Sequence, residues 1–175
     1  MLETVLTVDL GGSALKACLF DIEGRALGRA SEPLLFEEDA AGRSEQQPAS
    51  WWDALSRVLN RISADLGGRL GPVSAISICG FTRTQIFIDA EGGVVRPAIG
   101  FRDTRAAGVA IEAAALPGVA AHPEARNLNA FHPLARLLWV RRHEPDAWAT
   151  VRFVLEPKDY LAFRLTGRAA GERVS

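Results

Sequence analysis

Alternating apolar and polar residues at the start of the chain predict three consecutive strands. Two apolar runs rich in β-branched residues lie on either side of Gly11-Gly12-Ser13 within residues 5–21. Residues 22–25 form a second turn, and 26–36 returns as a mostly extended segment. Period-two alternation interrupted by glycine-containing turns is typical of antiparallel hairpins. We therefore expect a three-stranded antiparallel meander over residues 4–36.

The pattern then changes to the period of a helix. Residues 37–47 are polar without any period and are expected to form an exposed loop. Pro48 and Ser50 supply helix start signals, and Gly67-Gly68 supplies a stop. Apolar residues between them recur at steps of three and four, which predicts one buried stripe on a helix. The members of this stripe are Trp52, Leu55, Leu59, Ile62 and Leu66.

Two further strands are predicted on either side of a polar loop. Residues 73–79 alternate small polar with apolar side chains until Gly80 breaks the run, and 85–89 resumes as a strand. Between them lie Phe81-Thr82-Arg83. Open α/β folds place ligand contacts in loops that follow the carboxyl ends of strands. This loop is therefore a candidate binding segment.

Helices and one short strand are expected in the remainder of the chain. An alanine-rich helix is predicted over about residues 104–116, followed by a loop-like stretch with one helical turn over 117–130. The next helix opens at Pro133, and Pro145 ends it. Its predicted buried face carries Leu134, Leu137 and Leu138, and the last elements are a strand over 151–155 and a helix over 157–165.

The composition is that of an ordinary globular chain. Of 175 residues, 48% are hydrophobic and 23% are charged, which is enough for a real core. The net charge of −1 argues against nucleic acid or an acidic membrane surface as the main partner. We find no export signal and no apolar stretch long enough to span a membrane. Cys18 and Cys79 fall within predicted strands, so we expect reduced, buried thiols and, by default, a cytoplasmic protein.

The first hairpin carries the most suggestive chemistry. Asp9 closes the first strand and Lys16 lies near the start of the second, with Gly11-Gly12-Ser13 between them. Glycine lets backbone amides approach an anion closely, a carboxylate can hold a hydrated metal, and an ammonium group can neutralise phosphate. The alternative is a hairpin whose glycines only serve the turn.

A second polar cluster occurs in residues 96–105. This stretch concentrates three arginines and Asp103 around Phe101. The simplest interpretation is that Asp103 or Thr104 caps the helix that follows, because Asp is among the favoured N-cap residues.

Six separated segments together resemble one enzyme family. Any one of them is weak evidence, but all six occur in the family's order, and the chain resembles the FGGY carbohydrate kinases, xylulokinase-like members in particular. The segments are V-D-L-G-G-S-A-L-K (8–16), E-Q-Q-P-A-S-W-W (45–52), A-I-S-I-C-G-F-T-R-T-Q-I-F-I-D (75–89), R-P-A-I-G-F-R-D-T-R-A (96–106), L-L-W-V-R-R-H-E-P (137–145) and L-E-P-K-D-Y-L-A-F-R-L-T-G (155–167).

The resemblance implies an α/β fold of the actin-like ATPase, ribonuclease H-like class. Such a lobe has a mixed five-stranded sheet flanked by helices and opens with the three-stranded meander. The implied cofactors are ATP and Mg²⁺, with Asp9 holding the magnesium or its water and Lys16 countering developing charge. Gly11, Gly12 and Ser13 would bind phosphate. The implied partners are ATP and a small sugar or polyol. Neither nucleic acid nor a membrane is expected as a partner, and whether the protein forms a homodimer is left open by the sequence.

The implied sugar-binding residues depart from the family pattern. They are Phe81, Thr82, Arg83, Phe101 and Asp103. Phe81 stands where a glutamine is common, Arg83 where a histidine is common, and Phe101 where a tryptophan is common, while Asp103 keeps the family's aspartate. An arginine can form bidentate bonds to hydroxyls or a carboxylate, so a ketose, a polyol and a sugar acid all remain open. Gly12 replaces the usual threonine, which removes one hydroxyl from the phosphate turn.

The resemblance also implies that residues 1–175 are the sugar-side, N-terminal lobe and that this lobe is incomplete. The family's general base aspartate, its adenosine pocket and its ATP-side lobe would lie beyond Ser175. We therefore expect this polypeptide alone to be inactive and to be a portion of a longer kinase. The alternative is a non-catalytic sugar-binding or assembly module derived from the kinase lobe.

Overall fold

The computed structural model describes residues 3–68 and 71–171 of the chain, which divide into two compact units. The one lobe expected from the sequence thus consists of two parts, and the chain passes between them several times. Unit 1 takes its described residues from Met1–Leu35, Pro48–Phe81 and Pro157–Arg168, and unit 2 from Phe36–Gln47, Thr82–Glu156 and Ala169–Ser175.

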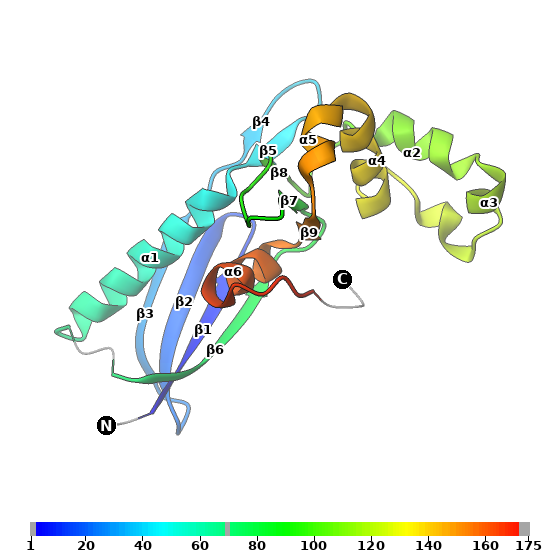
Figure 1. Ribbon diagram of the computed structural model, residues 1–175. Coiled ribbons are helices and arrows are strands. Elements are labelled where there is room, and N and C mark those ends of the chain that lie inside the picture. The colour runs from blue at the N-terminus through cyan, green and yellow to red at the C-terminus, as the bar shows by residue number, and fades with distance from the viewer. Residues whose placement is uncertain (1–2, 69–70, 172–175) are drawn as a thin grey trace. The chain divides into compact units, whose positions relative to one another are not determined.

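A four-stranded mixed sheet forms the centre of unit 1 (Figure 1). Its strands lie in the order β3-β2-β1-β6, and β6 runs parallel to β1 while the other neighbours are antiparallel. The predicted meander is confirmed. Where five strands were expected, the described residues of unit 1 supply four, because the later strand segments pair within unit 2. The bounds are Thr4–Leu10 for β1, Ala14–Asp21 for β2, Ala26–Pro33 for β3 and Val73–Gly80 for β6.

One face of this sheet is apolar and is covered by helices. The side chains of β1 and β2 that point to this face, such as Leu10 and Leu15, are fully buried. Helix α1 (Pro48–Asp65) packs against β2 and β3, and α6 (Pro157–Thr166) packs against β6 and α1. An edge-to-face pair of Trp51 and Tyr160, with ring centroids 6.1 Å apart, joins the two helices. The predicted hydrophobic alternation therefore builds this core directly.

The buried stripe of α1 is centred differently from the prediction. Leu55 and Ile62 are buried as expected, but Trp52 and Leu59 are only partly buried. Trp51, Ala54 and Val58 take the central positions instead. The stripe has the correct helical period and is turned by about one residue, with Trp51 in place of Trp52 on the buried face.

Strand β6 forms one edge of the sheet in the described part of unit 1. Its burial pattern shows no fully buried residue, and Ile76 is 46% exposed. Cys79 is exposed and Cys18 is half-buried, and neither forms a disulfide. The prediction of free thiols is confirmed, whereas the prediction that both are buried is wrong, since both lie on the face of the sheet opposite α1.

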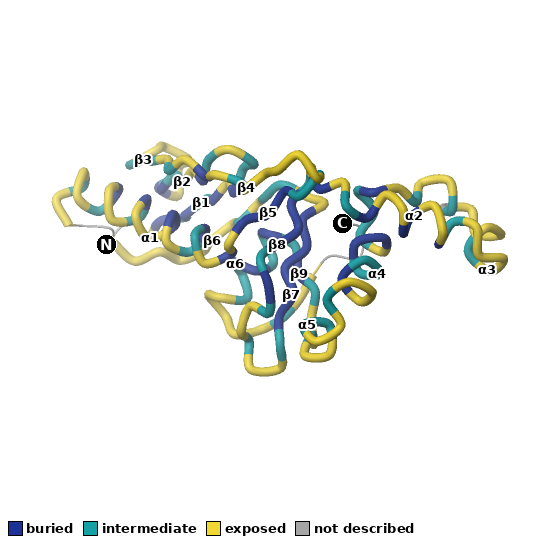
Figure 2. The backbone as a smooth tube through the Cα atoms, turned by 90° about the horizontal axis from the view of Figure 1, so that it is seen from above, coloured by how far each residue is buried: buried dark blue, intermediate teal, exposed yellow. Residues whose placement is uncertain are grey.

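The described residues of unit 2 form short strands and five helical segments. The strands form a three-stranded sheet, β4-β5-β8, and a pair, β7-β9 (Figure 2). Strand β7 is buried throughout, whereas β9 is buried only at Leu155. Phe87, Ile99 and Val140 are the centre of its core. The strand bounds are Glu37–Glu38 for β4, Ser44–Gln46 for β5, Ile86–Ile88 for β7, Ala98–Ile99 for β8 and Phe153–Leu155 for β9.

The polar segment 37–47 is exposed over 37–41, as predicted, but its later part is not the exposed loop that its polarity predicts. Residues 44–46 form β5 and are buried, with Glu45 only 6% exposed. Arginine side chains from other segments neutralise this glutamate, so a charged strand can be buried here.

The predicted helices of unit 2 are present, but the predicted N-cap of α2 and the predicted buried face of α4 are wrong. Helix α2 begins at Ala107 and has no side-chain cap, so neither Asp103 nor Thr104 caps it. On α4 the predicted Leu134 face is wrong, because Leu134 is 43% exposed while Ala135 and Arg136 are fully buried. The helical bounds are Ala107–Ala114 for α2, Pro117–Ala120 for α3, Pro123–Asn127 for the 3-10 helix η1, Pro133–His143 for α4 and Pro145–Thr150 for α5.

No helix within residues 3–68 and 71–171 has the length and apolar character needed to cross a membrane.

Candidate functional site

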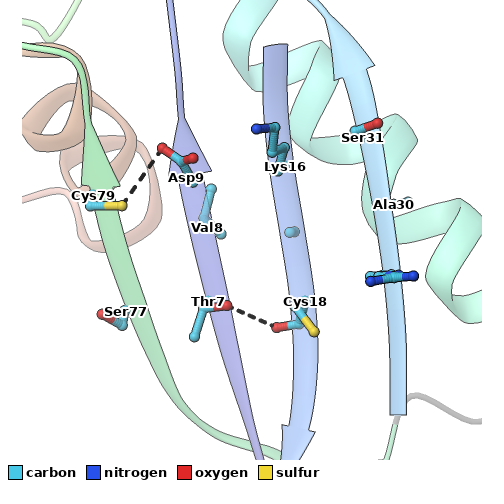
Figure 3. A pocket seen from close by; sticks show the side chains of 11 residues that line it. Thr7, Val8, Asp9, Lys16, Cys18, Ala30, Ser31, Ser77 and Cys79 are labelled. Carbon is cyan, nitrogen blue, oxygen red and sulfur yellow. Dashed lines mark hydrogen bonds between the residues drawn. The ribbon is translucent and has the colours of Figure 1, made fainter. Parts of the chain in front are cut away.

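The sheet register of unit 1 brings together two of the predicted phosphate-end residues. Asp9 is the cross-strand partner of Lys16 on β2 and of Cys79 on β6. The three residues lie on the face of the sheet opposite α1, as Figure 3 shows. Asp9 and Lys16 are both exposed. A carboxylate and an ammonium group are thus available to a ligand at the carboxyl end of β1.

A hollow of about 560 Å³ lies on this face, within the volume range of small-molecule sites. All of its lining residues belong to unit 1. The polar side chains that line it include Thr7, Asp9, Lys16, Arg29, Ser31 and Ser77. Sequence alternation predicted the apolar face of this sheet but gave no sign of the hollow, because side chains from three strands and a distant fourth make it.

The turn between β1 and β2 offers fewer donors than expected. The amide of Gly11 donates to the carbonyl of Ala14 at 3.0 Å, and a Cβ on Gly11 would lie 3.0 Å from that oxygen. The first glycine therefore serves the turn itself. Gly12 and the exposed Ser13 remain as the donors of this turn that could face a phosphate group.

Asp9 has a single weak protein donor in the described part of the chain. The thiol of Cys79 lies 3.7 Å from Asp9 Oδ1. Burial and the nearby Asp9 charge raise the pKa of Cys79, so the thiol stays protonated and donates. Within residues 3–68 and 71–171 no three His, Cys, Asp or Glu side chains gather as a metal cage. A lone exposed carboxylate suits Mg²⁺ that arrives with nucleotide phosphates and keeps most of its water.

The loop after β6 is shared between the two units. Phe81 closes a segment of unit 1, where its ring lies 5.8 Å from the ring of Trp51, edge to face. Thr82 and Arg83 belong to unit 2 and are exposed. Arg83 has φ = 58°, the left-handed region, and its amide donates to Glu156 Oε1 at 3.0 Å. The predicted binding loop therefore has a well-defined conformation at Arg83.

Asp103 is buried and its carboxylate is already well supplied with donors. It is 1% exposed. Its oxygens accept from Arg105 Nη2 at 2.7 Å and from the amide of Ser44 at 2.9 Å. Phe101 is half-buried and packs edge to face on Phe36 at 5.7 Å. Asp103 thus fixes the segment that carries Phe101.

A network of buried ions surrounds Asp103. Glu45 accepts from both Arg105 and Arg96, and Arg96 also bonds Glu144 at 2.6 Å. Burial alone would pull the pKa of Arg105 down, but its bonds to Asp103 and Glu45 outweigh this and raise it. The sequence showed the arginines of 96–105, but it could not show that Glu45, over fifty positions from Arg96, was their partner.

Arg136 is the most important residue of unit 2 that the sequence did not reveal. It lies on α4 and is 0% exposed, and its guanidinium donates to main-chain oxygens of Arg83 and Asp103. The only signal in the sequence was an arginine among leucines, and the leucine spacing pointed to a different face. Arg83 and Asp103 are thus joined within unit 2, whereas Asp9 and Lys16 belong to unit 1.

Comparison with known proteins gives a consistent family. Residues 4–174 match the FGGY family of carbohydrate kinases, N-terminal domain. The chain is 34% identical over 170 residues to the xylulose kinase of Escherichia coli (strain K12), covering 94% of this chain and 34% of that protein. It is 32% identical over 169 residues to a xylulose kinase of Staphylococcus epidermidis, covering 94% and 33%. The chain therefore spans about a third of the length of these curated relatives.

Solved structures support the same conclusion for the fold. A crystal structure described as a xyloylose kinase from Brucella ovis matches with a TM-score of 0.84 at 33% identity, over 94% of this chain and 34% of that one. The xylulose kinase from Rhodospirillum rubrum also matches with a TM-score of 0.84, at 25% identity, over 98% and 36%. The expected actin-like ATPase fold class is confirmed.

Proposed function

Because this chain belongs to the FGGY family of carbohydrate kinases, we propose that the protein carrying it transfers the γ-phosphate of ATP to a hydroxyl of a small ketose. Xylulose is the first candidate, since the relatives named above are xylulose kinases. The observation that supports this most strongly is the exposed pair Asp9 and Lys16, which the sheet register holds opposite each other and which lines a hollow. The chain would form the sugar-side part of that kinase.

At the phosphate end we propose that Asp9 holds Mg²⁺ through water and that Lys16 faces the transferred phosphoryl group. Phosphoryl transfer needs positioning and charge neutralisation more than covalent help from the protein. Mg²⁺ bound with ATP would supply the remaining neutralisation. Gly12 and Ser13 would add turn donors, because the amide of Gly11 is bonded to Ala14. An exposed carboxylate with one weak donor is free to take this role.

At the sugar end we propose that Phe81, Thr82, Arg83 and Phe101 contact the substrate. Arg83 is exposed and can bond two hydroxyls or a carboxylate, so polyols and sugar acids belong in any substrate test. A hydroxyl that reached Asp103 would compete with Arg105 and Ser44 for its oxygens. The larger contribution of Asp103 is therefore to hold the segment in place. The proton of the reacting hydroxyl would go to a general base that we expect outside this chain.

We propose the cytoplasm as the site of action. Both cysteines are free, which suits a reducing compartment.

The test is an ADP-release assay on the full-length gene product with MgATP and a panel of ketoses, polyols and sugar acids. We expect release above the sugar-free background with at least one sugar, and with xylulose first. Silence across the whole panel would contradict the proposal. If a sugar raised the melting temperature of the chain but released no ADP, the result would favour a non-catalytic sugar-binding module.

A further inference from the structure

Arg136 is a buried charge whose direct hydrogen-bond acceptors are all neutral. Its Nε donates to the carbonyl of Ala130 at 3.2 Å and its Nη1 to Gln85 Oε1 at 3.0 Å. Nη1 also donates to the carbonyl of Arg83, and Nη2 lies 3.4 Å from the carbonyl of Asp103. Four separate positions of unit 2 thus meet at one guanidinium group.

This arrangement is costly, which makes a role in simple packing a poor explanation. Burying a charge without an ionic partner in direct contact costs free energy that an apolar side chain of similar volume would avoid. Desolvation lowers the pKa of Arg136 to about 10, against the attraction of Asp103. A guanidinium group nevertheless offers five donors in a rigid plane, and a lysine could not span the same acceptors.

Two of the four residues that accept hydrogen bonds from Arg136 are Arg83 and Asp103. Both lie in segments that we propose contact the sugar. Arg83 is held in the left-handed region at φ = 58°, a conformation that is unfavourable for a non-glycine residue unless the surrounding structure holds it. Its amide is bonded by Glu156 and its carbonyl by Arg136, so both neighbouring peptide groups are fixed. The bond to Asp103 ties the segment with Phe101 to the same point.

We propose that Arg136 is the positioning residue of the sugar site. It holds the Arg83 loop and the Asp103 segment as one rigid piece, and it acts on the substrate through these two segments without touching it. This inference rests on the proposed function for its meaning. The claim that Arg136 holds the Arg83 loop in one conformation can be tested without measuring catalysis.

Arg96 provides a matched control. It is 7% exposed and belongs to unit 2, where it bonds Glu45 and Glu144. Within the described part of the chain, Arg96 donates no hydrogen bond to residues 82–85 or to Asp103. Arg96→Met therefore removes a buried arginine from this unit and leaves the hydrogen bonds of Arg136 in place.

The kinetic experiment compares Arg136→Met, Arg136→Lys and Arg96→Met in the full-length protein. We expect KM for the sugar to rise about tenfold or more in both Arg136 variants, because small misplacements in a site are costly, while KM for ATP stays within about twofold. Arg96→Met should lose stability and keep its sugar KM. Equal rises in sugar KM for Arg136→Met and Arg96→Met, or no rise in either, would overturn the proposal.

A second readout does not depend on catalysis. Amide hydrogen exchange of the full-length protein should speed up about tenfold or more at Arg83 in Arg136→Met and stay within about twofold in Arg96→Met. If Arg136→Met does not fold, Gln85→Met removes one hydrogen-bond acceptor of Arg136 and should speed up hydrogen exchange at the same amide. Unchanged hydrogen exchange at Arg83 in these variants would refute the proposal that Arg136 holds this loop in place. Silence of the wild-type kinase would refute only the proposed function.

Discussion

Asp9 of unit 1 and Asp103 of unit 2 are two carboxylates with proposed roles, and they are in opposite physical states. Asp9 is exposed at the end of a strand and has one thiol donor at 3.7 Å. Asp103 is 1% exposed and accepts from Arg105 and from the amide of Ser44. The difference indicates two different roles. The carboxylate of Asp9 is available to a ligand, whereas the carboxylate of Asp103 stabilises the structure around it.

The two states have different structural causes. Asp9 is positioned by the backbone bonds of β1 to two neighbouring strands, so its side chain needs no partner. Asp103 lies in an irregular segment, where backbone ladders are absent and side-chain ions do the same work. A site placed on a regular sheet can therefore leave its reactive group unbonded, whereas a site placed on loops depends on a buried network.

The largest expected effect in this comparison is on stability. Asp103→Asn removes a buried charge and leaves Arg105 and its neighbours with an unbalanced positive charge, which should lower the free energy of unfolding by about 3 kcal/mol. Urea unfolding of the chain measures this. The matched change Asp9→Asn should stay within about 0.5 kcal/mol of wild type, because Asp9 is exposed. Similar losses of unfolding free energy in Asp103→Asn and Asp9→Asn would contradict the difference in role between the two carboxylates.

The next effect concerns turnover. Lys16→Met should lower kcat by about thirtyfold, or about 2 kcal/mol of transition-state stabilisation, because a cation facing the phosphoryl group would be lost. Its melting temperature should not move, since Lys16 is exposed. Arg29→Met changes another exposed cation lining the same hollow and is the control. If both variants lowered kcat alike, the general charge of the hollow would matter more than the position of Lys16.

The smallest expected effect is the pH dependence of an ion cluster on unit 1. Hydrogen bonds from Arg57 and Arg61 lower the pKa of Glu32. A folded pKa below the unfolded value means that the contribution is present above the unfolded pKa and is lost as pH falls through the folded pKa. The melting temperatures of wild type and Glu32→Gln should therefore differ slightly at pH 7 and converge toward pH 3. A difference that grew on acidification would contradict this assignment.

The sequence predicted unit 1 well for reasons that are local. Alternation and turn glycines define β1 to β3, and proline and glycine mark the ends of α1. The pairing of Asp9 with Lys16 follows from the hairpin register alone. These features depend on residues that are close together along the chain.

The sequence predicted unit 2 less well because its contacts are distant. Segment 44–46 was expected to be exposed because it is polar, but it is buried, and Arg96 and Arg105 neutralise Glu45 within it. Arg136 was hidden by leucines whose spacing suggested another buried face. Charge compensation across fifty or more positions leaves no periodic signal, so no local pattern could have shown it.

The most direct test of the central claim is the rate of ADP formation by full-length Asp9→Asn at saturating MgATP and xylulose. Losing the proposed magnesium ligand should lower this rate at least about a hundredfold, while the melting temperature stays that of wild type. Activity close to wild type in this variant would contradict the role of Asp9 and, with it, the proposed phosphate site.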